Sequence, residues 1–455
     1  MNRIDNTQTL KIGKSYFNLS ICIVYITILI PSSIKVLSIS LFDIALLPII
    51  VLTIFKFLIE GIRRLKLNKI EYIIIFILAS NIFNYIAKYQ LQDENSFLQS
   101  VSLNADFIYI RLCIYAIVTI ITILIVYMIG KRSSLDSEKI NILLKHTFIA
   151  GIINSSINLF TWAFSTNLSF ARYNWLPPIS GSNGIHINLM ILINLISLLY
   201  IFINRLTNNK NDLLALSCFT LSLFNIVLIV SRLAWMQYYI CIILTFILLG
   251  RRFNLRSLRR YFIYINLLIF CLIGLLSILN SDVQVFNLFK EAFQAGGNEL
   301  NQGSWLMRFS LYQKAFNIFL ENSIFGCGYG HYILYSTASI FFQGLELNVS
   351  SPHNGLLTIM SEQGIVGIFL ISSLFIIITS ILYKLYLSIT NIKILIIIIP
   401  FFSYFLVQVL SHLIANSTII PLPGERDTVS FAIFIWLNIG LITSLNSSNS
   451  KFKKL

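Results

Sequence analysis

Charged side chains are scarce in this sequence. Asp, Glu, Lys and Arg make up 11% of its 455 residues, while hydrophobic residues make up 57%. A soluble globular chain carries roughly 25% charged residues, so this composition excludes a soluble multidomain protein and predicts one bundle embedded in lipid. The alternating pattern of a transmembrane barrel is absent as well, because the apolar runs are long and continuous.

Cysteine is also rare and is poorly placed for cross-linking. Of the six cysteines, five lie in predicted spans and only Cys327 lies in a predicted outer loop. A lone outer cysteine cannot form an intramolecular disulfide, and no spacing of Cys or His indicates a metal site. We therefore expect no metal and no cofactor. The first apolar run lacks a small-residue cleavage pattern and is too long for a cleavable signal, so we expect an anchor.

Long apolar runs, in contrast, are abundant. A helix needs about 20 apolar residues to cross the hydrocarbon core, and the sequence predicts an all-α, polytopic membrane protein with about 12 such helices. The predicted spans are 15–34, 36–59, 70–88, 107–129, 142–164, 184–204, 213–230, 233–249, 261–280, 354–382, 393–413 and 429–447. Spans 1–9 thus fill 1–280, an outer loop occupies 281–353, and spans 10–12 with a short tail occupy 354–455.

Basic residues are distributed unevenly along this topology. The formal net charge is +15, but with the N-terminus inside, 23 Lys and Arg fall in cytoplasmic segments and nine lie at or near the outer face. This is the positive-inside bias of multi-pass membrane proteins. Topology and contact with anionic membrane lipid therefore explain the basic runs, and no nucleic acid is expected. Both termini are predicted to be cytoplasmic.

One connection is far longer than the others. The outer loop at 281–353 has about 70 residues, and long ordered loops usually carry function. Aromatic residues recur at helical spacing within 304–321, which predicts a helix on the bundle or in the interface plane. A second short helix is predicted at 284–295, and the two glycines that follow it would end it. The loop would form a lid over the outer mouth of the bundle.

Arginine is prominent among the outer cations, which suggests a phosphate-bearing ligand. Arg111, Arg172, Arg232 and Arg308 lie beside the outer ends of predicted spans. An arginine at membrane depth is costly and usually faces a partner or a wet cavity, and guanidinium binds phosphate oxygens in bidentate geometry. These groups would suit a lipid diphosphate. Snorkelling to outer-leaflet headgroups is the alternative for each of them.

His353 is the strongest candidate for chemistry at this face. It lies in Ser-Pro-His-Asn at 351–354, where the tenth span begins. The unperturbed pKa of imidazole suits general-base catalysis near neutral pH, so His353 could activate a sugar hydroxyl; the alternative is an ordinary interfacial histidine. His331 and His412 are also expected to face the outer side, without an assigned role. The glycines at 326–330 look like a phosphate loop, but no strand precedes them, so we interpret them as a turn.

Three blocks of sequence resemble the O-antigen ligase and O-unit polymerase superfamily of bacterial surface-polysaccharide assembly. They are Ser-Arg with a following Trp at 231–235, Arg308 with the stretch leading to Ile-Phe-Gly-Cys-Gly-Tyr-Gly at 324–330, and Pro-His-Asn with Glu-Gln-Gly-Ile-Val-Gly within 352–367. A weaker fourth block is Arg172 before Ile-Ser-Gly-Ser-Asn-Gly at 179–184. No single block is specific, and the resemblance rests on their order, spacing and outer-face location.

The resemblance implies a C-type glycosyltransferase-like helical fold in the bacterial inner membrane. Such enzymes take an undecaprenyl-diphosphate-linked glycan at the periplasmic face and transfer it to an acceptor hydroxyl, without a nucleotide sugar or a metal. Carried over by position, Arg232 and Arg308 would bind the diphosphate and stabilise the leaving group, and His353 would activate the acceptor. The further expected substrate contacts are Arg172, Arg111 and Asn354.

Several functions stay open at this point. A polymerase accepts another lipid-linked repeat unit, whereas a ligase accepts lipid A–core; the blocks diverge from ligase patterns and the lid is moderate in size, which favours a polymerase by analogy. A protein that sets chain length is a possible partner. A transporter or flippase is the main rival, although no internal repeat is evident and the largest loop follows span 9. A non-enzymatic membrane scaffold is the last alternative.

Overall fold

A computed structural model describes most of the chain. The described residues are 6–30, 35–36, 39–60, 67–91, 105–133, 135–164, 185–207, 212–228, 232–251, 299–332, 340–342, 345–347, 351–412 and 427–452. Three predictions lie outside them, namely the ninth span at 261–280, the short loop helix at 284–295 and the surroundings of Arg172.

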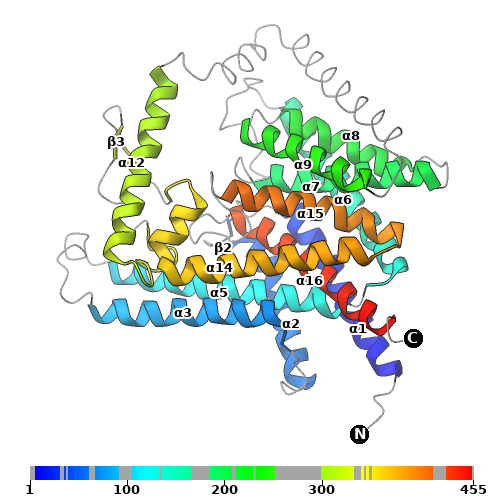
Figure 1. Ribbon diagram of the computed structural model, residues 1–455, viewed down its shortest axis with the longest axis horizontal. Helices are drawn as coiled ribbons and strands as arrows, with labels where there is room; N and C mark the ends of the chain where they lie inside the picture. Colours follow the sequence, from blue (N-terminus) through cyan, green and yellow to red (C-terminus); the bar gives the residue numbers. More distant parts are fainter. Residues whose placement is uncertain are drawn as a thin grey trace.

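Helices form the framework of the described structure (Figure 1). They are α1 (Asn6–Leu29), α2 (Leu41–Glu60), α3 (Lys69–Leu91), α5 (Ala105–Arg132), α6 (Ser137–Phe164), α7 (Ile185–Thr207), α8 (Leu213–Leu228), α9 (Arg232–Gly250), α12 (Glu299–Glu321), α14 (Gly355–Ser388), α15 (Ile392–His412) and α16 (Asp427–Phe452). Each predicted span other than 261–280 coincides with one of them, and α12 confirms the helix predicted at 304–321. Within the described residues, six helices are long and apolar enough to cross a membrane. The prediction of a helical, polytopic membrane protein is confirmed.

Four very short strands lie in the connections and were not predicted. β1 (Lys35–Val36) pairs antiparallel with β2 (Ile39–Ser40) at the break between the first two spans. β3 (Ile340–Phe342) pairs in the same way with β4 (Leu345–Leu347) in the outer loop. Both pairs are small ribbons beside an otherwise helical framework.

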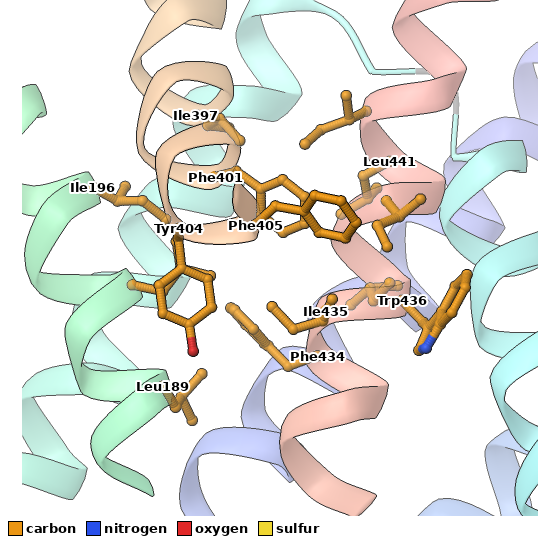
Figure 2. Packing of buried hydrophobic residues seen from close by; sticks show 14 of the residues in the cluster. Leu189, Ile196, Ile397, Phe401, Tyr404, Phe405, Phe434, Ile435, Trp436 and Leu441 are labelled. Atoms are coloured by element: carbon orange, nitrogen blue, oxygen red, sulfur yellow. The ribbon is translucent and has the colours of Figure 1, made fainter. Parts of the chain in front are cut away.

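The centre of the bundle is filled by aromatic and branched aliphatic side chains. Figure 2 shows this packing between α7, α15 and α16, with Leu189, Phe405 and Phe434 among the buried residues. Lipid tails are as apolar as these side chains, so close packing, more than the hydrophobic effect, holds such helices together.

Two glycines allow α5 and α16 to cross in close contact. A Cβ atom on Gly130 would collide with the backbone of Leu437 and Leu441, and one on Gly440 would collide with the carbonyl oxygen of Tyr127. Small residues at a crossing are a typical means by which membrane helices bring their backbones together.

Basic side chains gather at one end of the bundle, which we call the basic end. Lys131 Nζ lies 2.6 Å from Oε2 of the buried Glu71, and the Arg132 guanidinium donates to the Tyr16 hydroxyl at 3.0 Å. The start of α1 and the end of α16 lie at this end, on the right in Figure 1. The basic end therefore matches the side on which the sequence predicts the cytoplasm.

At the opposite end, which we call the site end, α12 runs across the direction of α3 and α5 (Figure 1). Its buried residues Ala315 and Ile318 pack with Cys327 and Tyr332, and Leu357 of α14 closes this small cluster. The loop helix is thus held against the beginning of α14, where His353 lies.

Candidate functional site

The helix that follows His353 is broken inside the tenth predicted span. Gly364 of α14 has φ 62° and ψ −158°, a conformation open essentially to glycine alone. A short arm at 355–363 precedes the break and a long arm at 365–388 follows it. The span predicted at 354–382 is present as α14, but it contains a break that the sequence did not predict, because hydropathy reports the apolar run and not the backbone conformation within it.

The glycine-rich turn at 322–330 satisfies the backbone groups that the break leaves open. Four hydrogen bonds join the turn to the two arms: Cys327 N–H to the Ser361 carbonyl (2.8 Å), Gly328 N–H to the Glu362 carbonyl (2.9 Å), Ile365 N–H to the Ser323 carbonyl (2.9 Å) and Val366 N–H to the Ile324 carbonyl (3.2 Å). Helix ends have unpaired N–H and C=O groups, and each one left unpaired in lipid costs several kcal/mol. The turn and the break therefore stabilise each other.

This contact also explains the glycines of the turn. Gly326 has φ 71°, and a Cβ atom there would collide with the backbone of Glu362 and Gln363. Its N–H donates to the Asn322 carbonyl at 2.8 Å. The N–H groups of Gly326, Cys327 and Gly328 are engaged by the protein itself, which supports a turn over a phosphate loop.

Helix α3 holds the other side of the turn. The Asn84 side-chain amide donates to the Phe325 carbonyl at 2.8 Å, and the Tyr85 hydroxyl donates to the Tyr329 carbonyl at 2.8 Å. The turn is thus held between α3 and the broken α14. Because α12 ends where the turn begins, the turn also holds the C-terminal end of α12 in place.

His353 occupies a strained backbone position just before α14. Its φ of 53° makes it the non-glycine residue with positive φ within the described part of the chain, and such residues are uncommon and concentrate at functional sites. Its side chain is exposed and accessible to a ligand. The next residue, Asn354, caps the short arm, since its Oδ1 accepts from the Leu357 N–H at 3.1 Å. Its expected contact with substrate therefore adds to a structural role.

Arg308 lies on α12, near enough to His353 for its charge to act on the imidazole. Protein atoms around the ring partly desolvate it although it stays accessible, which lowers the pKa of His353 below its ordinary value, and the positive charge of Arg308 lowers the pKa further. A lowered pKa keeps the imidazole neutral near pH 7, the form that accepts a proton. Arg308 itself is exposed, so its guanidinium is accessible to an anion beside the base.

The other predicted cations are placed less completely. Arg232 is the first residue of α9, and its side chain lies outside the described part of the chain. Trp235 positions this corner, because its indole N–H donates to the Ile226 carbonyl at the end of α8 at 2.9 Å. Arg111 is exposed on α5 near the site end, and Arg172 lies outside the described residues.

His331 and His412, which are expected on the outer side, are both buried within the described structure. His331 is 1% exposed, and its Nε2 lies 3.7 Å from the Cys113 sulfur. His412 is 5% exposed and packs against the backbone of Gly355. Each histidine borders an apolar run in the sequence, so only its folded neighbours decide whether it is buried. Within the described residues, no cluster of three His, Cys, Asp or Glu is placed to hold a metal.

The comparison with protein families bears on this region directly. Residues 217–372 match the family model described as O-antigen ligase. The matched segment runs from α8 to the long arm of α14, and it contains Arg232, Arg308, the turn and His353. No curated protein matches the chain. The family match confirms the resemblance to the O-antigen ligase and O-unit polymerase superfamily.

Proposed function

We propose that the chain, of which residues 217–372 match the O-antigen ligase family model, is a glycosyltransferase that polymerises undecaprenyl-diphosphate-linked repeat units. The reaction takes place at the periplasmic face of the bacterial inner membrane, with both termini in the cytoplasm. The partners are the lipid-linked donor, an acceptor glycan, membrane lipid and a chain-length regulator. The reaction uses no metal or other cofactor.

The chemistry assigns one step to each group. His353 takes the proton of the acceptor hydroxyl while that oxygen forms a bond to the anomeric carbon of the donor. The bond from this carbon to the diphosphate oxygen breaks, and its electron pair leaves with the diphosphate. Arg308 and Arg232 stabilise the negative charge that grows on the leaving group; removing one such preorganised group typically lowers the rate about 10²- to 10³-fold.

One observation carries the proposal, namely the placement of an exposed His353 beside the charge of Arg308. The two residues come from different elements, and the turn and the broken helix that hold them together are absent from ordinary membrane spans. A strained backbone at His353 and a lowered pKa fit a base better than an interfacial histidine. A transporter would not need this arrangement at one face alone.

A ligase is the second candidate, because the matched family carries that description. Ligase and polymerase share the donor and the proposed step and differ in the acceptor. The divergence of the sequence blocks and the moderate lid support a polymerase. An acceptor on lipid A–core would make the same residues a ligase.

The nature of the acceptor can be tested in a strain of the native host that lacks the gene. The measurement is a gel of the surface glycan together with an analysis of the lipid-linked pool. A polymerase predicts core with a single repeat unit and loss of the ladder. Bare core with long polymer on the lipid carrier would identify a ligase, and an unchanged ladder would reject both enzymes.

The catalytic assignment is tested by His353→Asn in the same strain. Asparagine tolerates positive φ but cannot serve as a base, so we expect transfer to fall about 10²- to 10⁴-fold while membrane yield and melting temperature stay at wild-type values. The matched control is His146→Asn, since His146 lies on α6 and bonds the Tyr25 hydroxyl; it should restore the full ladder. A full ladder from His353→Asn would disprove the role of His353.

A further inference from the structure

The buried imidazole of His412 forms no hydrogen bond within the described structure. His412 is the last residue of α15 and is 5% exposed. Both of its ring nitrogens are buried, and neither has a hydrogen-bond partner among the described residues. Buried polar groups are nearly always hydrogen-bonded, and the exceptions call for an explanation such as an ion, a water or a ligand.

The polar neighbours of His412 on the same helix are satisfied. Ser411 Oγ accepts from the Gln237 side-chain amide of α9 at 2.9 Å. Gln408 donates to Asn188 Oδ1 at 3.2 Å and to a hydroxyl of its own helix. The outer ends of α7, α9 and α15 therefore meet in a hydrogen-bonded polar layer, and the His412 ring is the exception within it.

The ring of His412 lies in the angle of the broken helix. A Cβ atom on Gly355 in the short arm would collide with its Nδ1 and Cε1 atoms, and the ring of Phe375 in the long arm meets it edge-on at 5.6 Å between centroids. Figure 1 shows the end of α15 beside the short arm. Gly355 follows His353 by two positions, so the ring contacts the short arm two residues after the proposed base.

We propose that His412 is a substrate-binding residue, whose ring nitrogens hydrogen-bond hydroxyl groups of the glycan held at His353. A neutral imidazole has one donor and one acceptor nitrogen, and a sugar hydroxyl can bond with either. The polar layer of Gln237, Ser411 and Gln408 beside it suits a hydroxyl-rich ligand more than a lipid tail. This inference rests on the proposed glycosyl transfer and adds a contact on the substrate to it.

The decisive comparison is His412→Leu with His412→Gln in purified protein in detergent. The substrate is the lipid-linked repeat unit extracted from the deletion strain, and kcat, KM and melting temperature are measured. Leucine fills the space without a polar atom, so kcat/KM should fall roughly 10- to 100-fold, mainly through KM. Glutamine keeps a donor and an acceptor and should retain activity within roughly fivefold of wild type.

Thermal stability separates a substrate contact from a structural one. If the ring bonds the substrate, His412→Leu removes a polar group that the free protein leaves unpaired, so its melting temperature stays the same or rises. If another part of the chain bonds the ring, activity and melting temperature fall together, and the proposal is overturned. The control is His146→Leu, which breaks the 2.8 Å bond to Tyr25 and should lower stability without changing kcat/KM of the folded protein.

Two further outcomes distinguish this inference from the function itself. An active His412→Leu beside an inactive His353→Asn would reject the role of His412 and leave the transferase intact. An active His353→Asn would reject the proposed base, and the substrate role of His412 with it.

Discussion

Glycine brings backbones into contact in two regions of this protein, and the two regions use it differently. Where α5 crosses α16, Gly130 and Gly440 provide space between two regular helices. At the site end, Gly326 and Gly364 also provide space, but both have positive φ, and the backbones they join are hydrogen-bonded to each other. The first contact lies within ordinary spans, and the second carries a broken helix that begins beside His353.

The difference separates stability from function. At the crossing of α5 and α16, the requirement is steric alone: the residue must lack a Cβ atom. A larger residue there separates the two helices and weakens the bundle. In the turn and the break, the requirement is conformational as well as steric, and loss of fit moves the short arm of α14. His353 precedes that arm, and Arg308 lies on the helix packed against it. The backbone contact between the turn and the break therefore sets the positions of both residues.

The largest effect is expected from Gly364→Ala. Alanine at φ 62° and ψ −158° is strained by on the order of 1–3 kcal/mol, and its Cβ atom would collide with the Ile324 carbonyl. The short arm must shift, so we expect transfer to fall at least about 100-fold, as misplacement of a catalytic group commonly does. The measurement is the glycan ladder of the complemented deletion strain together with membrane yield.

Gly326→Ala serves as the companion to this change, because it disturbs the same contact from the side of the turn. Both substitutions should give the same loss. Wild-type ladders from either variant would show that the break does not position the site.

A smaller effect, on stability alone, is expected from Gly440→Ala. The added methyl group would press on the Tyr127 carbonyl, and overpacking of this kind costs typically about 1–3 kcal/mol. The melting temperature in detergent should fall, while transfer per folded molecule stays at the wild-type level. A Gly440→Ala variant that kept its stability but lost transfer would show that the contact between α5 and α16 serves the site, contrary to the role in stability assigned to it.

The same contrast shows how far sequence alone leads. Spans such as 393–413, observed as Ile392–His412, were predictable because lipid requires long apolar helices with internally paired backbones. The break at Gly364 was not, because its hydrogen-bond partners lie in a turn some forty residues earlier in the sequence. His353 and Arg308 were identified through their sequence blocks. Their proximity, and the burial of His412 against the short arm, depend on how the broken helix, α12 and α15 meet.

The smallest and most specific effect concerns the pH dependence of Arg308→Gln. The positive charge of Arg308 disfavours protonation of His353 and so lowers its pKa; without this charge the pKa should rise towards the ordinary value of about 6.5. A base acts only when neutral, so activity is lost as pH falls through its pKa, and the acid limb of kcat/KM should move to higher pH in the variant. The control is Arg308→Lys, which keeps the charge and should leave the limb near its wild-type position, although its maximum falls with the loss of bidentate phosphate binding. If Arg308→Gln lowers the maximum but leaves the limb in place, Arg308 acts on the diphosphate alone and the titrating base is a residue other than His353.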